Sequence, residues 1–392
     1  MPLQNIAIIG AGLGGLGAAL ALHSQGFKVT VYEQASPHER FAGAIMLSPN
    51  GLRILDKYGL YDGGSSSDLK KQGHSFQYVD FQDDQANSTS RLVLGDKHHF
   101  EYDALRIYRN VLRTALETAV RASGIPLEYG KKAAGVVEKE EDDEDNGQER
   151  AVRVSFADGS TATADLLVAA DGIHSKIRAL LFPGVVPVYQ RVLAVCGAVE
   201  MAAIAKVIPP GQTIDGPIAQ SGKKVGAFVI APQRADGSEL LAGTQREFPQ
   251  QDRAGWERIA ADKAFQRAFL EEGMASRTEL MQVAIRNVTD DSLYTWPMHT
   301  LPRLERWASE KGRVVLIGDA AHAIPPTTGQ GANQALEDGA PLEEQQKLNE
   351  KDLFGSSGAG ENLRWLYEPK IEERVDKWVE ETKQKEGPKG QN

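Results

Sequence analysis

The apolar and polar positions at the start of the chain predict a strand, a helix and a second strand. Asn5 to Gly10 is an apolar run, Leu13 to Gln25 is rich in alanine and leucine, and Lys28 to Glu33 is a second apolar segment. The uncharged stretch from Ile6 to Leu22 is long enough to suggest a membrane segment. Glycines interrupt it and no basic leader precedes it, so a buried βαβ start without a membrane anchor is favoured.

The middle of the chain contains a predicted helix followed by three predicted strands. Residues 103–122 have apolar positions at helical spacing. Strands are predicted over 133–140, 151–156 and 161–169. The loop Glu138 to Asp145 is almost wholly acidic, and we interpret it as a solvated hairpin tip because dense like charges repel. A calcium site there is the alternative.

The pattern changes over residues 183–280. Short apolar runs are separated by proline and glycine, and a helix-like stretch follows from Trp256 to Glu272. Strands without intervening helices are typical of an antiparallel sheet, so a second domain is predicted. His74 to Phe81 is a candidate further strand of that domain, whereas Val283 to Trp296 is expected to return to the first one.

Composition narrows the possible partners. The net charge of the 392 residues is −10, and no basic stripe is visible, which argues against nucleic acid or an anionic membrane. Cys196 is the single cysteine, so an intramolecular disulfide and a cysteine-based zinc cluster are excluded. A reducing, cytoplasmic location without a bound metal is the corresponding expectation.

A glycine motif follows the first strand. In Gly10-x-Gly12-x-x-Gly15 the first glycine permits a tight turn, the second lets a pyrophosphate approach the backbone, and the third lets the helix pack on the strand. Glu33 ends the second strand, where a carboxylate binds ribose hydroxyls. This motif fits NAD and FAD enzymes about equally, and a glycine turn without a ligand is the minor alternative.

Two further segments favour FAD. Arg109 begins a helix, where the helix dipole disfavours a cation, so an anionic partner such as a pyrophosphate would explain it. A solvated arginine is the alternative, and Arg106 competes for the same role. Asp171-Gly172 forms a strand-to-helix turn, with Ser175 near the helix start.

The segment from Gly312 to Gly339 is the most specific. A buried strand over Val314 to Ile317 delivers Asp319 to a turn, and a second helix begins near Ala332. A carboxylate at the strand end can bind a sugar-like hydroxyl, and the unpaired amides of the helix start face negative charge. For a flavin, that charge lies on N1 and the C2 oxygen of the reduced ring.

The segments around Gly10, Asp171 and Asp319 together resemble the motifs of the FAD-dependent aromatic hydroxylases. These are the single-component flavoprotein monooxygenases related to salicylate and para-hydroxybenzoate hydroxylase. The chain looks like a fungal secondary-metabolism type. The resemblance implies non-covalent FAD, NADPH or NADH as electron donor, and O2. It further implies hydroxylation or epoxidation of an electron-rich aromatic or polycyclic small molecule through a C4a-hydroperoxyflavin. The cofactor-binding residues that it implies are Gly10, Gly12, Gly15, Glu33, Arg40, Ala44, Arg109, Asp171, Asp319, Gly331, Ala332 and Asn333.

The same resemblance predicts the fold and domain limits. We expect an α/β fold with a Rossmann-like FAD-binding domain and a second domain built on an antiparallel sheet. The FAD-binding domain is assigned to residues 1–72, 98–182 and 281–338, and the substrate domain to 73–97 and 183–280. Residues 339–392 are expected to form a C-terminal helical region, in which Trp365 to Lys383 has an apolar helix face.

Departures from the family leave the substrate open. Many fungal relatives carry an arginine before a glycine, and a tyrosine before a proline, in substrate-domain strands. This chain has Cys196-Gly197 and Ala231-Pro232 there, so no catalytic residue is assigned. His322 resembles a general base but is expected to be structural. An FAD oxidoreductase that inserts no oxygen, or a flavin-binding protein that has lost turnover, remains an alternative, and nothing indicates the oligomeric state.

Overall fold

The computed structural model describes residues 4–36, 43–63, 68–138, 151–208, 213–222 and 226–339. Three predictions lie outside these residues: Arg40 as a charge partner, most of the acidic loop after Glu138, and the helical region after Gly339.

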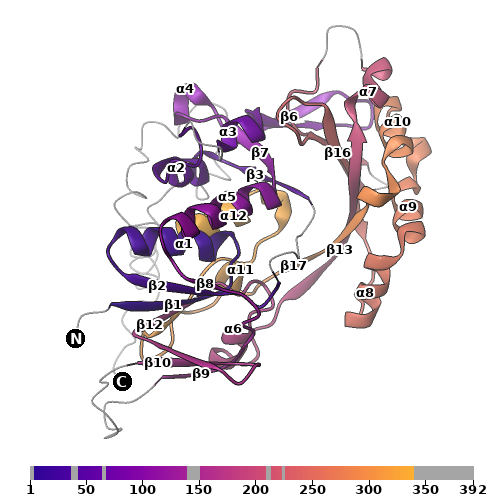
Figure 1. Cartoon of the computed structure of the whole chain (residues 1–392). Helices are drawn as coiled ribbons and strands as arrows, with labels where there is room; N and C mark the ends of the chain where they lie inside the picture. Colours follow the sequence, from indigo (N-terminus) through magenta and orange to yellow (C-terminus); the bar gives the residue numbers. More distant parts are fainter. Residues whose placement is uncertain are drawn as a thin grey trace, which may run out of the picture.

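A five-stranded parallel sheet forms the centre of the first domain (Figure 1). Its order is β18-β12-β1-β2-β8. The strands are β1 (Asn5–Ile9), β2 (Lys28–Tyr32), β8 (Leu127–Glu128), β12 (Leu166–Ala169) and β18 (Val314–Leu316). Neighbouring residues of a strand face opposite sides, so Ile6 and Ile8 enter one core while Ala7 and Ile9 enter another. The predicted Rossmann-like α/β fold is therefore confirmed.

Helices cover one face of this sheet and a small sheet covers the other. The helices are α1 (Leu13–Ser24), α2 (Pro49–Lys57), α5 (Arg109–Ala122) and α12 (Gly331–Glu337). The opposite face packs against β9 (Ala133–Glu138), β10 (Val152–Phe156) and β11 (Thr161–Ala164). The single strand predicted over 161–169 is thus two strands. Asp165 separates them because its carboxylate accepts the Asn5 amide at 2.8 Å and its own amide binds the Asn5 carbonyl.

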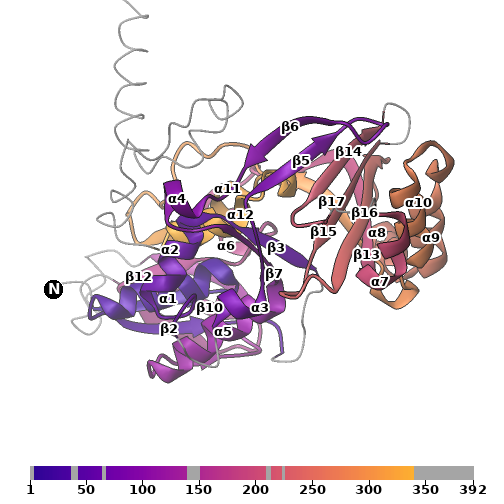
Figure 2. The same cartoon turned by 90° about the horizontal axis from the view of Figure 1, so that it is seen from above.

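A seven-stranded sheet forms the second domain, in the order β17-β13-β16-β15-β14-β5-β6. It contains β5 (Tyr78–Gln82), β6 (Ser88–Val93), β13 (Val188–Glu200), β14 (Ile218–Gly222), β15 (Gly226–Pro232), β16 (Glu239–Glu247) and β17 (Tyr294–Thr300). All pairs are antiparallel except β14 with β5. Figure 2 shows the sheet between the first domain and the helices α8 (Arg253–Ala261), α9 (Lys263–Glu271) and α10 (Glu279–Asn287).

Two boundaries in this region differ from the predictions. Residues 281–300, which the sequence assigned to the FAD-binding domain, belong to the large sheet: α10 packs on it and β17 pairs with β13. The helix predicted from Trp256 to Glu272 is two helices. Asp262 divides them with φ −89° and ψ 92°, and its side chain caps α9 by accepting the Phe265 amide at 2.9 Å.

A three-stranded antiparallel sheet lies between the two domains. It contains β3 (Ala44–Leu47), β4 (His74–Phe76) and β7 (Ala104–Tyr108), with β7 in the middle. Leu47, Leu105 and Ile107 enter the core of the first domain, so the alternating residues Arg106 and Tyr108 point to the other side. The predicted strand His74 to Phe81 is divided between this sheet and the large one. The remaining short helices include α3 (Leu69–Gln72), α4 (Lys97–Phe100), α6 (Lys176–Leu181), α7 (Met201–Ile204) and α11 (Asp319–His322).

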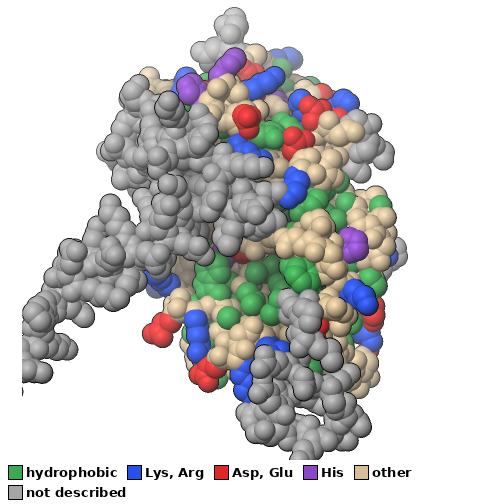
Figure 3. Space-filling view, turned by 90° about the vertical axis from the view of Figure 1, so that its left-hand side faces the viewer, with side chains coloured by type: hydrophobic (Ala, Val, Ile, Leu, Met, Phe, Trp, Pro, Cys, Tyr) green, Lys and Arg blue, Asp and Glu red, His purple; other side chains and the backbone are tan. Residues whose placement is uncertain are grey.

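The surface carries charges of both signs. On the face drawn in Figure 3, basic and acidic side chains are interspersed around a group of hydrophobic ones. Among the described residues, no helix is long and apolar enough to cross a membrane, and no group of three or more His, Cys, Asp and Glu side chains is placed to hold a metal ion.

Candidate functional site

The predicted motifs meet at one edge of the parallel sheet. Gly10 follows β1, Glu33 follows β2, Asp171 follows β12, and Asp319 follows β18. The carboxyl ends of parallel strands lie at the same edge, which is where α/β folds bind their ligands. Four segments that are up to 309 residues apart in sequence, Gly10 to Asp319, are therefore neighbours around one site.

Gly10, Gly12 and Gly15 each occupy a different structural environment. Gly10 has φ +105°, a conformation that other residues rarely adopt. A Cβ atom on Gly15 would lie 2.0 Å from the Gly10 carbonyl oxygen, so only glycine allows α1 to approach the end of β1. A Cβ on Gly12 would meet no atom of the described residues within 4 Å. Gly12 therefore borders open space where α1 begins, which is where a pyrophosphate can approach the backbone.

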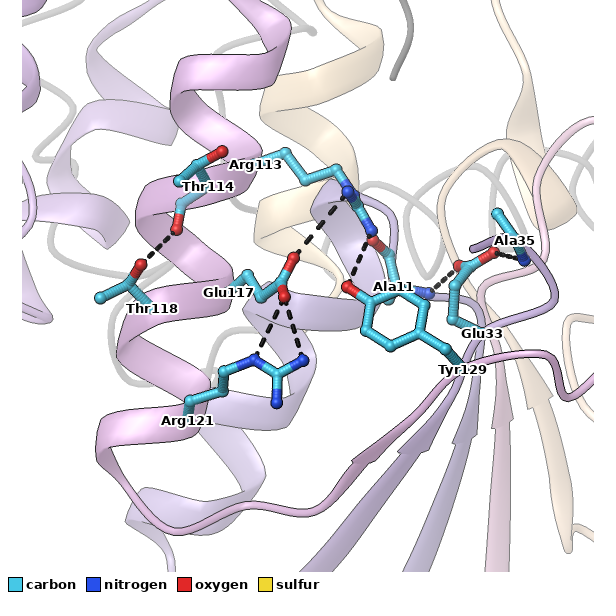
Figure 4. A network of polar contacts seen from close by, with 9 residues as sticks. All are labelled: Ala11, Glu33, Ala35, Arg113, Thr114, Glu117, Thr118, Arg121 and Tyr129. Carbon is cyan, nitrogen blue, oxygen red and sulfur yellow. Dashed lines mark hydrogen bonds and ion pairs between the residues drawn. The ribbon is translucent and has the colours of Figure 1, made fainter. Parts of the chain in front are cut away.

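Glu33 is held beside this glycine turn (Figure 4). Its carboxylate accepts the Ala11 amide at 2.7 Å and the Ala35 amide at 2.8 Å. The Ala11 carbonyl in turn accepts Nε of Arg113 on α5 at 3.1 Å. Arg113 was missed in the sequence. Its position four residues after Arg109, on the same helix face, was the available signal.

Asp171 holds the turn of the middle motif, and Arg178 connects this motif to the Asp319 segment. One Asp171 carboxylate oxygen accepts the Lys176 amide at 2.8 Å, whereas Oδ1 is buried without a hydrogen-bond partner. Arg178 is fully buried, and its guanidinium donates to the carbonyls of Ile173 at 2.6 Å and Ala320 at 3.0 Å. Arg178 thereby fixes α11, at whose first residue Asp319 lies, to the turn after β12.

Asp319 has an exposed carboxylate at the start of α11. A Cβ on Gly331 would lie 4.0 Å from its Oδ1, so the strand end and the start of α12 are adjacent. Arg109 lies on the same side: burial lowers the pKa of its guanidinium, and the attraction of Asp319 opposes this shift. The Arg109 amide donates to the Gly43 carbonyl at 3.0 Å, which brings Ala44 to the site.

Asn333 is a structural bridge as well as a member of the first turn of α12. Its side chain is fully buried and accepts the Ser48 amide at 3.0 Å, while it donates to the carbonyls of Gly329 at 2.8 Å and Met46 at 3.2 Å. The Asn333 side chain therefore holds β3 against the start of α12. This leaves its backbone amide, with those of Gly331 and Ala332, for the predicted flavin contact.

His322 is paired with a carboxylate at the end of α12. Its Nε2 lies 2.6 Å from Asp338 Oδ2, which also accepts the Gly318 amide at 2.6 Å. Burial alone would lower the pKa of His322, but the hydrogen bond and charge of Asp338 outweigh burial and raise it. These contacts support the structural role expected of His322.

Cys196 faces the first domain from the large sheet. Leu193, Val195 and Val199 enter the core beneath α9 and α10, so Cys196 points to the other face of β13. There the Tyr294 hydroxyl hydrogen-bonds to its sulphur, and Arg106 of β7 is close enough to lower the thiol pKa, although burial is stronger and raises it to about 11. The sequence placed neither Arg106 nor Tyr294 at this point, because three separate strands supply the group.

The residues at the sheet edge fit FAD. A dinucleotide with a ribityl chain requires room for its pyrophosphate and acceptors for its sugar hydroxyls. The sheet edge offers open space over Gly12, the Glu33 carboxylate after β2 and the exposed Asp319 carboxylate. It also offers a buried Asp171 oxygen that has no partner among the described residues. The arrangement therefore has the features expected of a dinucleotide site.

Comparison with known proteins identifies the class. A family model described as "FAD binding domain" matches residues 4–348. The 6-hydroxynicotinate 3-monooxygenase of Bordetella bronchiseptica is 30% identical over 341 residues, covering 86% of this chain and 81% of the relative. The 3-amino-4-hydroxybenzoate 2-monooxygenase of Streptomyces cremeus is 31% identical over 342 residues, covering 85% and 76%. The chain belongs to this family, that of the FAD-dependent aromatic hydroxylases.

Solved structures share the fold. The crystal structure of Klebsiella pneumoniae HpxO complexed with FAD and uric acid has a TM-score of 0.69 at 23% identity, covering 96% of this chain and 92% of that one. A salicylate hydroxylase substrate complex has a TM-score of 0.67 at 22% identity, covering 90% and 81%. At these identities the likeness establishes the fold.

Proposed function

We propose that this protein is an FAD-dependent monooxygenase that uses NADPH or NADH and O2 to hydroxylate or epoxidise an electron-rich aromatic or polycyclic small molecule. The observation that carries the proposal is the meeting of three separate motifs, those of Gly10, Asp171 and Asp319, at one sheet edge beside a second domain. Both relatives named above are monooxygenases of hydroxylated aromatic acids by their names.

The geometry of the chain supports a set of proposed cofactor contacts. Gly10, Gly12 and Gly15 would admit the pyrophosphate, Glu33 would bind the ribose hydroxyls, and Asp319 would bind a ribityl hydroxyl. Amides in the first turn of α12 would face N1 and the C2 oxygen. FAD, when bound, would supply the redox chemistry, in which two electrons from the nicotinamide donor and one O2 would give one oxygen atom to the substrate and one molecule of water.

The chain's own part is to position groups and exclude water. Arg178 and Asn333 fix α11 and α12 relative to the sheet, so the carboxylate and amides are in place before any ligand binds. Tyr108 links the domains because its hydroxyl hydrogen-bonds to Glu239 of β16. We place the substrate ring between β3, β7 and the large sheet.

The purified protein provides the test. We expect a yellow protein whose NADPH or NADH oxidation requires O2 and is accelerated by an aromatic substrate, with 6-hydroxynicotinate and 3-amino-4-hydroxybenzoate as first compounds. Labelled O2 should deliver one oxygen atom to the product. A colourless protein that takes up no added FAD would contradict the proposal. A yellow protein whose substrate-dependent oxidation inserts no labelled oxygen would instead identify an FAD oxidoreductase.

A further inference from the structure

Arg106 is a buried cation on the substrate side of β7. The neighbouring residues Leu105 and Ile107 enter the core of the first domain, so Arg106 points away from it, towards the large sheet. Only 6% of its surface is exposed. The groups that act on its charge are Tyr294, Cys196 and Tyr108, and burial lowers the pKa of its guanidinium.

No described residue balances the charge of Arg106. Its Nε is buried without a hydrogen-bond partner, and no carboxylate is among the groups that shift its pKa. Glu239 is the buried acid on the facing strand β16, but it is already committed. It accepts the Tyr108 hydroxyl and forms an ion pair with Arg234 at 2.8 Å. A dehydrated guanidinium without a counter-ion is strongly unfavourable, so this position calls for an external anion.

The groups that act on the charge of Arg106 are neutral. Burial raises the pKa of the Cys196 thiol to about 11 and raises the pKa of Tyr294 as well, so both carry their protons at neutral pH. Cys196 itself is only partly buried. Two glycines let the backbone pack closely against these neutral neighbours. A Cβ on Gly243 would lie 2.4 Å from Cys196 Sγ, and one on Gly43 would lie 3.2 Å from the Tyr294 hydroxyl.

Arg106 and its neutral neighbours adjoin the segment from Gly312 to Gly339. Arg106 of β7 pairs with Met46 of β3. A Cβ on Gly329, in the loop before α12, would lie 3.0 Å from Met46 Cε. Arg106 is therefore one strand away from the segment assigned to the flavin ring, on the face that looks towards the large sheet.

We propose that Arg106 binds an anionic group of the aromatic substrate, either a carboxylate or a ring oxyanion, with Tyr294 and Cys196 as neutral neighbours that define its specificity. This inference rests on the proposed function. The resemblance expects an arginine on β13, at the position where Cys196 stands. In this assignment the cation lies instead on β7, on the opposite side of the expected substrate position.

Binding to the FAD-loaded protein tests the role of Arg106 without turnover. The matched variants are Arg106→Gln, which removes the charge, Arg106→Lys, which keeps it, and Arg191→Gln, which removes an exposed arginine from β13. Ligand binding is followed by the change in the visible flavin spectrum. One arm compares 6-hydroxynicotinate with 6-hydroxynicotinamide, which lacks the carboxylate. The other compares 4-nitrophenolate with 4-nitroanisole, which cannot ionise.

We expect Arg106→Gln to weaken binding of the anion about tenfold or more while the neutral partner changes little, because charge-assisted hydrogen bonds are among the strongest. Arg106→Lys should recover part of the affinity, and Arg191→Gln should match the wild type. The arm that shows the loss identifies the anion as carboxylate or ring oxyanion. Removing an unbalanced buried charge should leave the thermal midpoint of the ligand-free protein unchanged or raised.

Equal affinities in the wild type and Arg106→Gln, or a wild type that shows no preference for either anion, would overturn the assignment. A lowered thermal midpoint that Arg106→Lys restores without recovery of anion binding would identify a structural residue instead. These outcomes are distinct from failure of the proposed function, which would appear as a wild-type protein that does not retain FAD.

Discussion

Replacement of Gly12 and Gly15 by alanine separates cofactor binding from folding. A Cβ on Gly12 meets nothing within 4 Å, and its φ of −77° suits any residue. Gly12→Ala should therefore leave the FAD-free protein as stable as the wild type or more stable, by up to about 1 kcal/mol, because alanine restricts the unfolded chain. The new methyl would occupy the space assigned to the pyrophosphate, so we expect FAD affinity to fall about tenfold or more, about 1.4 kcal/mol.

Gly15→Ala acts on the fold itself. Its Cβ would lie 2.0 Å from the Gly10 carbonyl oxygen, and real Cβ atoms essentially never approach closer than 3.0 Å. The end of β1 and the start of α1 would have to separate by at least 1 Å, from 2.0 Å to 3.0 Å. Overpacking of this kind costs about 3 kcal/mol, and the better helix propensity of alanine returns about 1 kcal/mol. We expect a net loss of about 2 kcal/mol.

Two measurements distinguish the variants. Thermal unfolding of the FAD-free proteins reports the fold, and titration with FAD, followed by quenching of flavin fluorescence, reports the site. Gly12→Ala should lose affinity at unchanged stability, whereas Gly15→Ala should lose stability first. The reasoning is refuted if Gly12→Ala binds FAD like the wild type, or if the FAD-free forms of both variants unfold at the same lowered temperature.

Three further predictions concern the strand ends. Asp319→Ala should lose bound FAD while the FAD-free protein keeps its thermal midpoint; full occupancy in the purified variant would contradict the assigned contact. Arg178→Lys cannot reach the carbonyls of Ile173 and Ala320 together and should destabilise the protein by about 2 kcal/mol, measured by urea unfolding against the exposed control Arg153→Lys. The fold raises the pKa of His322, so the pair of His322 with Asp338 stabilises the folded state fully at pH values below the unfolded pKa of about 6.5. This stabilisation disappears as the pH rises through the higher pKa of the folded state. The difference in the free energy of unfolding between the wild type and Asp338→Asn should therefore decrease as the pH rises. A difference independent of pH would show that the pair is not ionised.

The local parts of the fold were predictable because their causes are local. The βαβ start follows from the glycines at positions 10, 12 and 15 between two apolar strands, and Gly10 and Gly15 have the steric reasons expected of them. Asp319 and Gly331 were placed correctly at a strand end and a helix start. In such segments, neighbouring residues decide the conformation, so the pattern of the chain is sufficient.

Pairing between distant segments was less predictable. The stretch 161–169 looks like one strand, but contacts with Asn5 divide it and place its second half between β1 and β18. The assignment of residues 281–300 to the first domain was wrong for a similar reason: β17 finds its partner in β13, more than ninety residues earlier, as in the pair Tyr294 with Cys196. A strand carries an alternating pattern whichever sheet it joins.

The sequence alone determined the kind of cofactor site, since a glycine turn, a carboxylate and a helix start are read from consecutive residues. Only the tertiary structure decided which groups each arginine contacts. Arg109 lies by Asp319, Arg113 holds the glycine turn, and Arg106 faces Cys196 and Tyr294 across two sheets. Burial and the distance between charges set these roles. Both quantities depend on how sheets stack, which no local pattern in the chain records.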